Sequence, residues 1–298
     1  MNRDKRLFLY LNGRQRTAVR AGQGGMMGRV AQAVERAGWP VILLPEEARE
    51  AAAAVDGYHL VLNAEVKGDF CLSLRRCYMD PFWRIEDTND RWGWEVGRKA
   101  FDDASVPAGW ARAFRDRWRV QLFKDQPIRR DGHIFVPLQG KLLRRRSFQS
   151  MSPIEMLQAT LAADPTRRVI ATLHPAEEYT VEERTALNAL AGPRFELSDQ
   201  PSIRLLATCD LVVTQNSSMA LTGFFAGKAA VLFAQTDFHH LAGSVPRDGL
   251  AAAFDHAERP VDYAAYLLWF FKRNAITSWA DDVEVQILAR LRHHGWRL

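Results

Sequence analysis

Four polar clusters in the second half of the chain carry residue types that could bind an anion or move a proton. Each cluster directly follows an apolar run, at residues 134–138, 168–173, 211–214 and 229–233, that we expect to be a buried strand. Because the carboxyl ends of parallel strands lie together, parallel strands would place all four clusters at one edge of a sheet. The clusters are Gln139-Gly140, His174-Pro175, Gln215-Asn216-Ser217-Ser218 and Gln235-Thr236-Asp237.

The two serines of the third cluster stand where a helix should begin. The small and apolar residues that follow predict a helix over 217–226, so Ser217 and Ser218 fall in its first turn. Unpaired backbone N–H groups and the positive end of the helix dipole favour a phosphate at such a place. In a simpler interpretation, Asn216 or Ser217 only caps the helix, which contributes about 1 kcal/mol and needs no ligand.

His174 also has two interpretations. Its imidazole could donate a hydrogen bond to a phosphate or carboxylate at the sheet edge. It could instead be a packed turn residue, because Pro175 fixes the backbone and cannot continue a sheet interior. Convergence with the other clusters favours binding, and we take His174 and Asp237 as candidate catalytic residues.

The elements that must position these residues alternate between strands and helices. In the first half, strands at 6–11, 41–44 and 59–66 are separated by predicted helices at 26–38 and up to 54. In the second half, helices at 153–163, 181–191 and 202–209 lie between the strands, with a further short strand at 195–198. Residues 71–123, rich in Trp and Arg, contain a predicted helix near 111–119 but are otherwise unassigned. This alternation predicts an α/β fold with two Rossmann-like domains, whose parallel sheets face a cleft.

Composition narrows the function classes. The 298 residues have a net charge of +5, which suggests an anionic partner, and are 47% hydrophobic, as in a globular protein. Three cysteines form neither a paired disulfide framework nor a metal-binding spacing, so we expect no metal, no cofactor and a reducing, cytoplasmic location. The densest apolar run, residues 263–271, is far shorter than the roughly 20 residues that span a bilayer.

Three segments of the second half, taken together, resemble a known family. "VPLQ" (136–139), "IATLHP" (170–175) and "LLATCDLVVTQNSSMALTGFFAGKAAVLF" (205–233) occur in the order and spacing of capsular polysaccharide synthesis proteins related to bacterial 3-deoxy-manno-octulosonic acid (Kdo) transferases. The resemblance covers about residues 134–241. It implies a two-domain GT-B fold and a site for a CMP-activated sugar, with His174, Ser217 and Ser218 contacting the nucleotide sugar and Gln139 beginning a loop that faces it.

The resemblance also bears on domain limits. We expect an N-terminal, acceptor-side domain at 1–125, a nucleotide-sugar-binding domain at 126–275 after the linker-like "DQPIRRDGH", and a C-terminal helix at 276–298. The closing residues resemble the helices of GT-B enzymes that cross back to the first domain. Their aromatic face, like the Trp-rich stretch from Trp83 to Trp118, could alternatively contact a membrane surface from its inner side.

One departure from the family pattern concerns the catalytic carboxylate. Relatives often carry an acidic residue shortly after the Gln that ends the "PLQ" strand, whereas residues 139–153 here contain none. A glycosyl transfer needs a base or nucleophile and positive charge for the departing phosphate. The other acidic candidates are Glu177, Glu178, Glu65 and Asp69. Each could also be an ordinary surface carboxylate. The positive charge could come from Lys141, Arg144, Arg145 and Arg146, unless these residues form only a solvated loop.

The main hypothesis is therefore a GT-B glycosyltransferase that moves a sugar, with Kdo from CMP-Kdo as the favoured donor, onto a surface polysaccharide or glycolipid. The absent carboxylate favours an alternative, a non-catalytic GT-B-like binding or scaffold protein in polysaccharide assembly. A nucleic-acid-binding protein would suit the pI of about 9.3, but the sequence has no recognisable module of that kind and its basic residues are spread.

Overall fold

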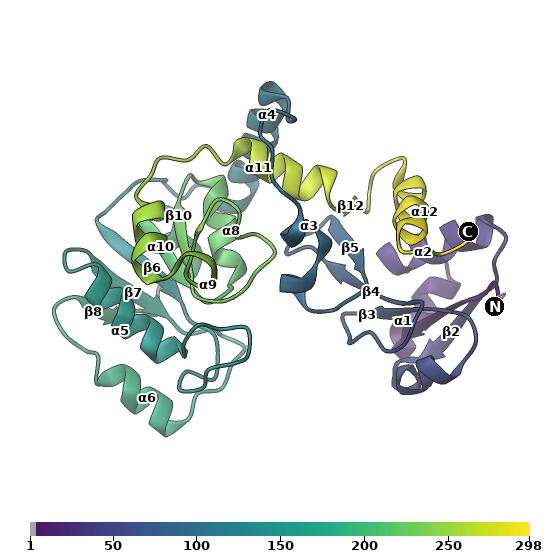
Figure 1. The fold of residues 1–298 in the computed structure, drawn as a ribbon, viewed down its shortest axis with the longest axis horizontal. Helices are drawn as coiled ribbons and strands as arrows, with labels where there is room; N and C mark the ends of the chain where they lie inside the picture. Colours follow the sequence, from purple (N-terminus) through teal and green to yellow (C-terminus); the bar gives the residue numbers. More distant parts are fainter. Residues whose placement is uncertain (1–3) are drawn as a thin grey trace. The chain divides into compact units, whose positions relative to one another are not determined.

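The computed structural model describes residues 4–298, which divide into two compact units (Figure 1). Unit 1 comprises the residues up to Arg98 together with Phe270–Leu298, and unit 2 comprises Lys99–Trp269. The chain thus leaves unit 1 once and returns to it once. Each unit is built on its own six-stranded sheet.

Unit 1 has a mostly parallel sheet with the strand order β12-β5-β4-β3-β1-β2. Strands β1 to β4 pair in parallel, while β5 is antiparallel to both β4 and β12. The elements of this unit are β1 (Leu7–Leu11), α1 (Gly13–Arg20), α2 (Gly25–Arg36), β2 (Val41–Pro45), the 3₁₀ segment η1 (Glu46–Ala54), β3 (Tyr58–Leu62), β4 (Cys71–Arg76), β5 (Phe82–Glu86), η2 (Arg91–Gly93), α3 (Glu95–Arg98), β12 (Ile276–Thr277) and α12 (Val283–His293). The π-helical segment η3 (Trp269–Arg273) carries the chain back into the unit.

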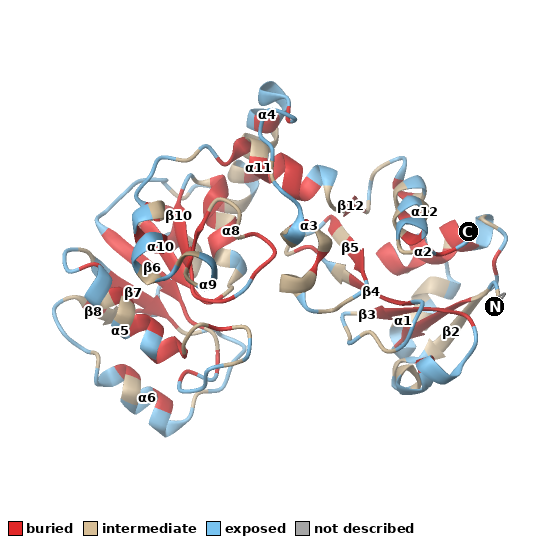
Figure 2. Ribbon diagram, viewed as in Figure 1, coloured by how far each residue is buried: buried red, intermediate tan, exposed pale blue. Residues whose placement is uncertain are grey.

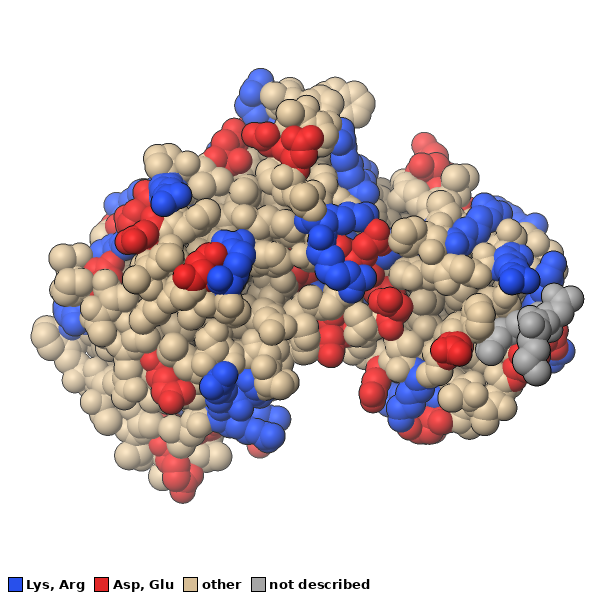
Figure 3. All heavy atoms as spheres, in the orientation of Figure 1, with Lys and Arg blue, Asp and Glu red and all other residues tan. Residues whose placement is uncertain are grey.

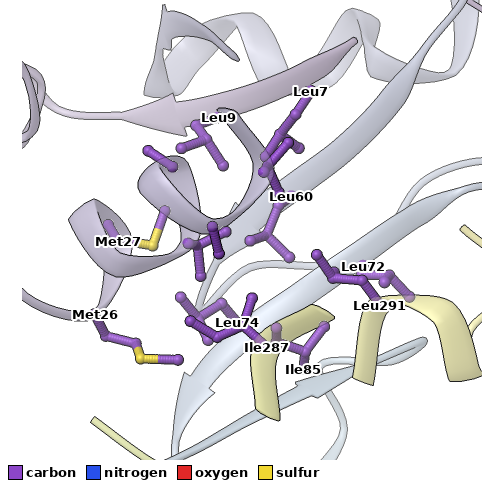
Figure 4. Close-up of a cluster of buried hydrophobic side chains, with 14 of the residues drawn as sticks. Leu7, Leu9, Met26, Met27, Leu60, Leu72, Leu74, Ile85, Ile287 and Leu291 are labelled. Atoms are coloured by element: carbon purple, nitrogen blue, oxygen red, sulfur yellow. The ribbon is translucent and has the colours of Figure 1, made fainter. Parts of the chain in front are cut away.

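The main core of unit 1 lies between this sheet and two helices from opposite ends of the chain. Alternate residues of β1 face α2, which presents Met26, Met27 and Val30 at helical spacing. Helix α12 adds Ile287 and Leu291 beside them, as Figure 4 shows. Unit 1 is therefore completed only by the C-terminal segment.

Unit 2 has an all-parallel sheet with the strand order β11-β10-β9-β6-β7-β8. Its elements are α4 (Ala108–Phe123), β6 (His133–Pro137), α5 (Pro153–Ala163), β7 (Arg168–Thr172), α6 (Val181–Asn188), β8 (Phe195–Leu197), α7 (Ser202–Thr208), β9 (Leu211–Thr214), α8 (Ser218–Phe225), β10 (Ala229–Leu232), β11 (Gly243–Ser244), α9 (Val245–Asp248), α10 (Leu250–Ala257) and α11 (Ala264–Leu268). The order of strands and helices expected for this half is confirmed, and the ends of most elements agree with the expected ones to within two residues.

Helices cover both faces of the unit 2 sheet, so its central strands are buried throughout (Figure 2). On one face Ile134 and Val136 pack with α5, α6 and α10. On the other face, α7 and α8 contact the strands, and α4 and α11 pack behind α8. Burial on both faces explains why the sequences of these strands are continuous apolar runs.

The limits of the units differ from the expected domains. The boundary lies at residues 98 and 99 rather than at 125 and 126, because α4 packs against α8 and α11 of unit 2. The "DQPIRRDGH" segment is not a linker between units, since Arg129 and Asp131 donate backbone hydrogen bonds to Ala207 and Thr208 at 3.0 and 2.9 Å. The C-terminal segment that belongs to unit 1 begins at Phe270 rather than at residue 276.

Asp164 contributes stability to unit 2 that should depend on pH. Burial raises the pKa of its carboxyl, but hydrogen bonds from Arg167 and Thr166 outweigh burial and lower the pKa to about 2. A lowered folded pKa gives stability that is present above the unfolded pKa near 4 and is lost as the pH falls towards 2. Asp164→Asn should cost about 2 kcal/mol at pH 7, and little at pH 2, in urea unfolding. The exposed Asp199→Asn is the control, and an equal loss at both pH values would contradict this account.

Candidate functional site

The polar clusters expected to converge do lie at one edge of the unit 2 sheet. Strands β6, β7, β9 and β10 are all parallel, and β6 lies between β9 and β7. Gln139 therefore follows the central strand of the group, with His174 on one side and the Gln215 to Ser218 loop on the other. This carboxyl edge is the candidate site.

A carboxylate lies beside Gly140 even though residues 139–153 contain none of their own. Gly140 is buried, and a Cβ atom built on it would lie 2.1 Å from Oε2 of Glu177. The Glu177 side chain thus lies directly over the Gly140 backbone, and the missing side chain of this glycine makes room for it. The carboxylate beside Gly140 thus belongs to the loop after β7, not to the loop after β6.

The turn that carries Glu177 begins at His174. The Glu177 N–H donates to the carbonyl oxygen of His174 at 3.2 Å, and the backbone N–H of His174 donates to the hydroxyl of Tyr179 at 2.8 Å. Burial raises the pKa of Tyr179, which keeps this hydroxyl protonated. His174 and Glu177 are therefore held on a single ordered turn, with both side chains exposed.

The hydrogen bonding of His174 fixes which ring nitrogen points outward as a donor. Its Nδ1 accepts from the backbone N–H of Ala176 at 3.2 Å. A neutral imidazole whose Nδ1 accepts must carry its proton on Nε2. His174 can thus offer an N–H to an anionic oxygen without first becoming charged.

Glu183 ties together the two loops that bear these groups. Its Oε2 accepts from the Thr180 N–H at 3.0 Å and closes a capping box at the start of α6. Its Oε1 accepts from the backbone N–H of Leu142 at 2.5 Å, so the loop after β6 is held against the loop after β7. The Thr-x-x-Glu pattern could have revealed the cap, but the contact with Leu142 joins segments about 40 residues apart.

The Gln215 to Ser218 loop divides into structural and exposed residues. Gln215 is buried and donates from its side-chain amide to the Met151 carbonyl oxygen at 2.9 Å. Ser217 caps α8, because its hydroxyl oxygen accepts from the Met219 N–H at 3.3 Å, while Asn216 is half-buried. Ser217 therefore caps α8, as one of the two interpretations expected; its contact with a nucleotide sugar stays a prediction. Ser218 is exposed at the first helical position, where it remains a candidate contact for a ligand.

Asp237 does not have the exposure that a substrate-contacting base needs. The residue is 0% exposed and lies within the loop that follows β10. Sequence reasoning could not separate it from Gln235, which is exposed two residues earlier. Glu177 replaces Asp237 as the carboxylate best placed to meet a ligand.

The basic run after Gly140 is partly structural. Nε of Arg145 donates to the Gln149 carbonyl oxygen at 3.0 Å, and the Arg146 guanidinium lies 5.1 Å from the Phe148 ring centroid. Lys141 and Arg144 are exposed and can supply positive charge. On the face drawn in Figure 3, basic groups lie in small sets among acidic ones and form no continuous stripe of the kind that binds nucleic acid.

Two further observations concern metals and membranes. Within residues 4–298, no group of three or more His, Cys, Asp or Glu side chains is arranged to hold a metal ion. None of the helices in this range has the length and hydropathy needed to cross a bilayer.

Two mostly parallel sheets, each flanked by helices and each in its own unit, define an α/β protein of the GT-B type. The solved structure of Thermosulfurimonas dismutans KpsC, beta Kdo 2,7 transferase, is similar with a TM-score of 0.50 and 13% identity, over 98% of this chain and 100% of that one. That of T. dismutans KpsC, beta Kdo 2,4 transferase, has a TM-score of 0.46 and 11% identity, over 88% and 89%. Searches of family models and of curated proteins gave no match. At this identity the likeness shows the fold alone.

Proposed function

We propose that this protein is a glycosyltransferase that takes a sugar from a nucleotide-sugar donor bound at the carboxyl edge of the unit 2 sheet. The observation that carries the proposal is the turn on which the Glu177 carboxylate and the His174 imidazole stand, with Glu177 lying over Gly140. The fold supports it, because the similar T. dismutans protein is a Kdo transferase.

In this proposal the residues divide into a phosphate side and an acceptor side. Nε2–H of His174 and the hydroxyl and backbone N–H of Ser218 bind the donor phosphate and stabilise its charge as it departs. Lys141 adds positive charge from the neighbouring loop. Glu177 accepts the proton of the acceptor hydroxyl as that oxygen attacks the sugar.

CMP-Kdo is the favoured donor within this class. Both its phosphate and the carboxylate of its sugar are anionic, which suits exposed Lys141 and Arg144 in the loop after β6. Kdo is also the sugar that the similar T. dismutans protein transfers. We further propose a surface polysaccharide or glycolipid as the acceptor, reached at the inner face of a membrane.

A nucleotide-sugar panel tests the proposal. CMP-Kdo at 100 times its dissociation constant should add about 2.7 kcal/mol to the stability measured in a thermal shift. UDP- and GDP-sugars at the same concentration should add less, because they bind more weakly. His174→Ala and Ser218→Ala should each weaken binding about ten- to a hundredfold through the loss of a charge-assisted hydrogen bond. Ser217→Ala is the matched control, because loss of a cap should cost about 1 kcal/mol of stability and leave the affinity of the folded protein unchanged.

Several outcomes would contradict parts of this proposal. If no nucleotide sugar stabilises the protein, or if His174→Ala and Ser218→Ala bind as well as the parent, the site is wrong. If donors bind but no sugar is transferred to any acceptor or to water, the protein is a binding or scaffold protein in polysaccharide assembly rather than an enzyme.

A further inference from the structure

Unit 1 contains a pocket that the proposed donor site does not use. It has a volume of about 370 Å³ and opens where α2 begins and where the chain continues beyond β12. Residues that line it include Gly22, Gln23, Arg29, Gln32, Ser278 and Trp279. Its volume lies within the usual range for small-molecule sites.

The pocket lies at the edge of the unit 1 sheet where α/β proteins bind ligands. Strand β12 is antiparallel to β5, and β5 is antiparallel to β4, so β12 runs in the same direction as β4 and its parallel neighbours. Ser278 and Trp279 follow β12 and therefore lie at the carboxyl edge. Helix α2 starts on the same side, because it returns the chain from the end of β1 to the start of β2.

Trp279 is exposed to an unusual degree for its residue type. Its exposed fraction is 61%, whereas Trp94 and Trp118 are buried; Trp110 of unit 2 is also exposed, at 77%, but does not line this pocket. A large aromatic ring at the rim of a polar pocket offers an apolar face, on which the C–H face of a sugar ring can stack.

The polar side chains of the pocket are available to a ligand. Within residues 4–298, the side chains of Gln23, Arg29 and Gln32 form no hydrogen bond or ion pair with the protein. Each amide offers both donors and an acceptor, which suits sugar hydroxyls. Arg29 offers a planar guanidinium that can bind a carboxylate through two hydrogen bonds. No acidic side chain lines the pocket, so its charge is positive.

Two glycines at the rim of the pocket have a left-handed backbone conformation. Gly22 and Gly25 have φ values of 71° and 55°, a conformation that other residues adopt only with strain. Neither would meet another atom within 4 Å if a Cβ were added, so open space adjoins both positions. The backbone conformation, rather than crowding, explains why glycine is present.

We propose that this pocket binds a saccharide bearing a carboxylate, which stacks on Trp279 and pairs with Arg29, while Gln23 and Gln32 bind its hydroxyls. The inference stands on unit 1 alone and does not require transfer activity in unit 2. A nucleotide could also stack on an indole, but the pocket offers a single cation and several neutral amides, which suits a hydroxylated ring with one acidic group better than a phosphate chain.

Calorimetric titration of the full chain with four probes tests this inference. Trigalacturonate should bind at least about tenfold more tightly than neutral maltotriose, and citrate and CMP should not bind through Trp279. Trp279→Ala should weaken trigalacturonate binding at least about tenfold. Arg29→Gln should weaken it about tenfold and remove the preference over maltotriose.

Matched controls come from α4 of unit 2, outside this pocket. Trp110→Ala removes an indole that is 77% exposed, and Arg117→Gln removes an exposed guanidinium, so both should bind trigalacturonate as the parent does. All variants alter exposed side chains and should keep the parent melting temperature. The inference is overturned if trigalacturonate does not bind, if either pocket variant binds it as the parent does, or if CMP or citrate binds with the same dependence on Trp279. Nucleotide-sugar binding in Trp279→Ala reports separately on the donor site.

Discussion

Glu177→Gln is expected to lower sugar transfer by about 10²- to 10⁴-fold and to leave donor affinity within about twofold of the parent. Glutamine keeps the size of the side chain but cannot accept the acceptor proton. The Glu177 side chain is exposed, so an acceptor can reach it, and its carboxylate lies over the backbone of Gly140. Single-turnover transfer and equilibrium donor binding, measured on the same samples, separate the two effects.

Two further variants test whether the effect is specific to the Glu177 carboxylate. Glu178→Gln removes the adjacent exposed carboxylate and should leave transfer unchanged. Gly140→Ala puts a methyl group where Oε2 of Glu177 now lies, so it should displace the carboxylate and reduce transfer while Glu177 itself is intact. If Glu177→Gln transfers sugar at the parent rate, or if Glu178→Gln is equally impaired, Glu177 is not the base.

Gly243→Ala is expected to destabilise unit 2 by about 3 kcal/mol, the largest stability effect of a single methyl group that we anticipate. A Cβ at this position in β11 would lie 2.0 Å from the carbonyl oxygen of Ala253 and 2.7 Å from its carbonyl carbon. Both atoms belong to the backbone of α10, which cannot move without disturbing the core beneath it.

Gly109→Ala is the control for this substitution. A Cβ at Gly109 meets nothing within 4 Å, and the residue is the second of α4, so alanine should stabilise the helix by up to about 0.5 kcal/mol. Urea unfolding of both variants measures the contrast. A Gly243→Ala protein as stable as the parent would mean that α10 does not approach β11 as closely as the structure has it.

The regular elements of unit 2 could be predicted because their sequence carries local signals. The strands are apolar runs, and Ser152 and Thr180 begin helices with capping boxes that have Glu155 and Glu183 three residues later. In unit 1, α1 was not predicted, since it has no buried face and therefore no apolar period. Local patterns therefore predict the elements of unit 2 but give no signal for α1.

Strand β5 was missed for a different reason, which is that it buries charges. Arg84 in β5 is buried and donates to the carbonyl oxygens of Asn274 and Phe270 at 2.5 and 3.0 Å. Glu86 is buried against Arg290 of α12 at 2.9 Å. These partners lie about 190 to 200 residues away in the sequence, so no local pattern could mark Arg84 and Glu86 as interior residues.

The candidate site was predictable in its location but not in its chemistry. The shared edge follows from parallel strands, which the alternation of elements implies. The burial of Asp237, the position of Glu177 over Gly140 and the pocket beside Trp279 all depend on how loops pack. Loop packing joins distant segments, such as those of Leu142 and Glu183, and leaves no periodic trace in the sequence.

Because unit 1 consists of two separate segments of the chain, the two units must complete their folding in a certain order during synthesis. Unit 2 is one continuous segment that can fold once Trp269 has left the ribosome. Unit 1 at that moment lacks β12 and α12, so the face of its sheet that Ile287 and Leu291 cover is still bare. The N-terminal segment of unit 1 therefore stays incompletely folded, with apolar surface accessible to chaperones or to neighbouring nascent chains, until α12, encoded more than 180 residues later, covers it.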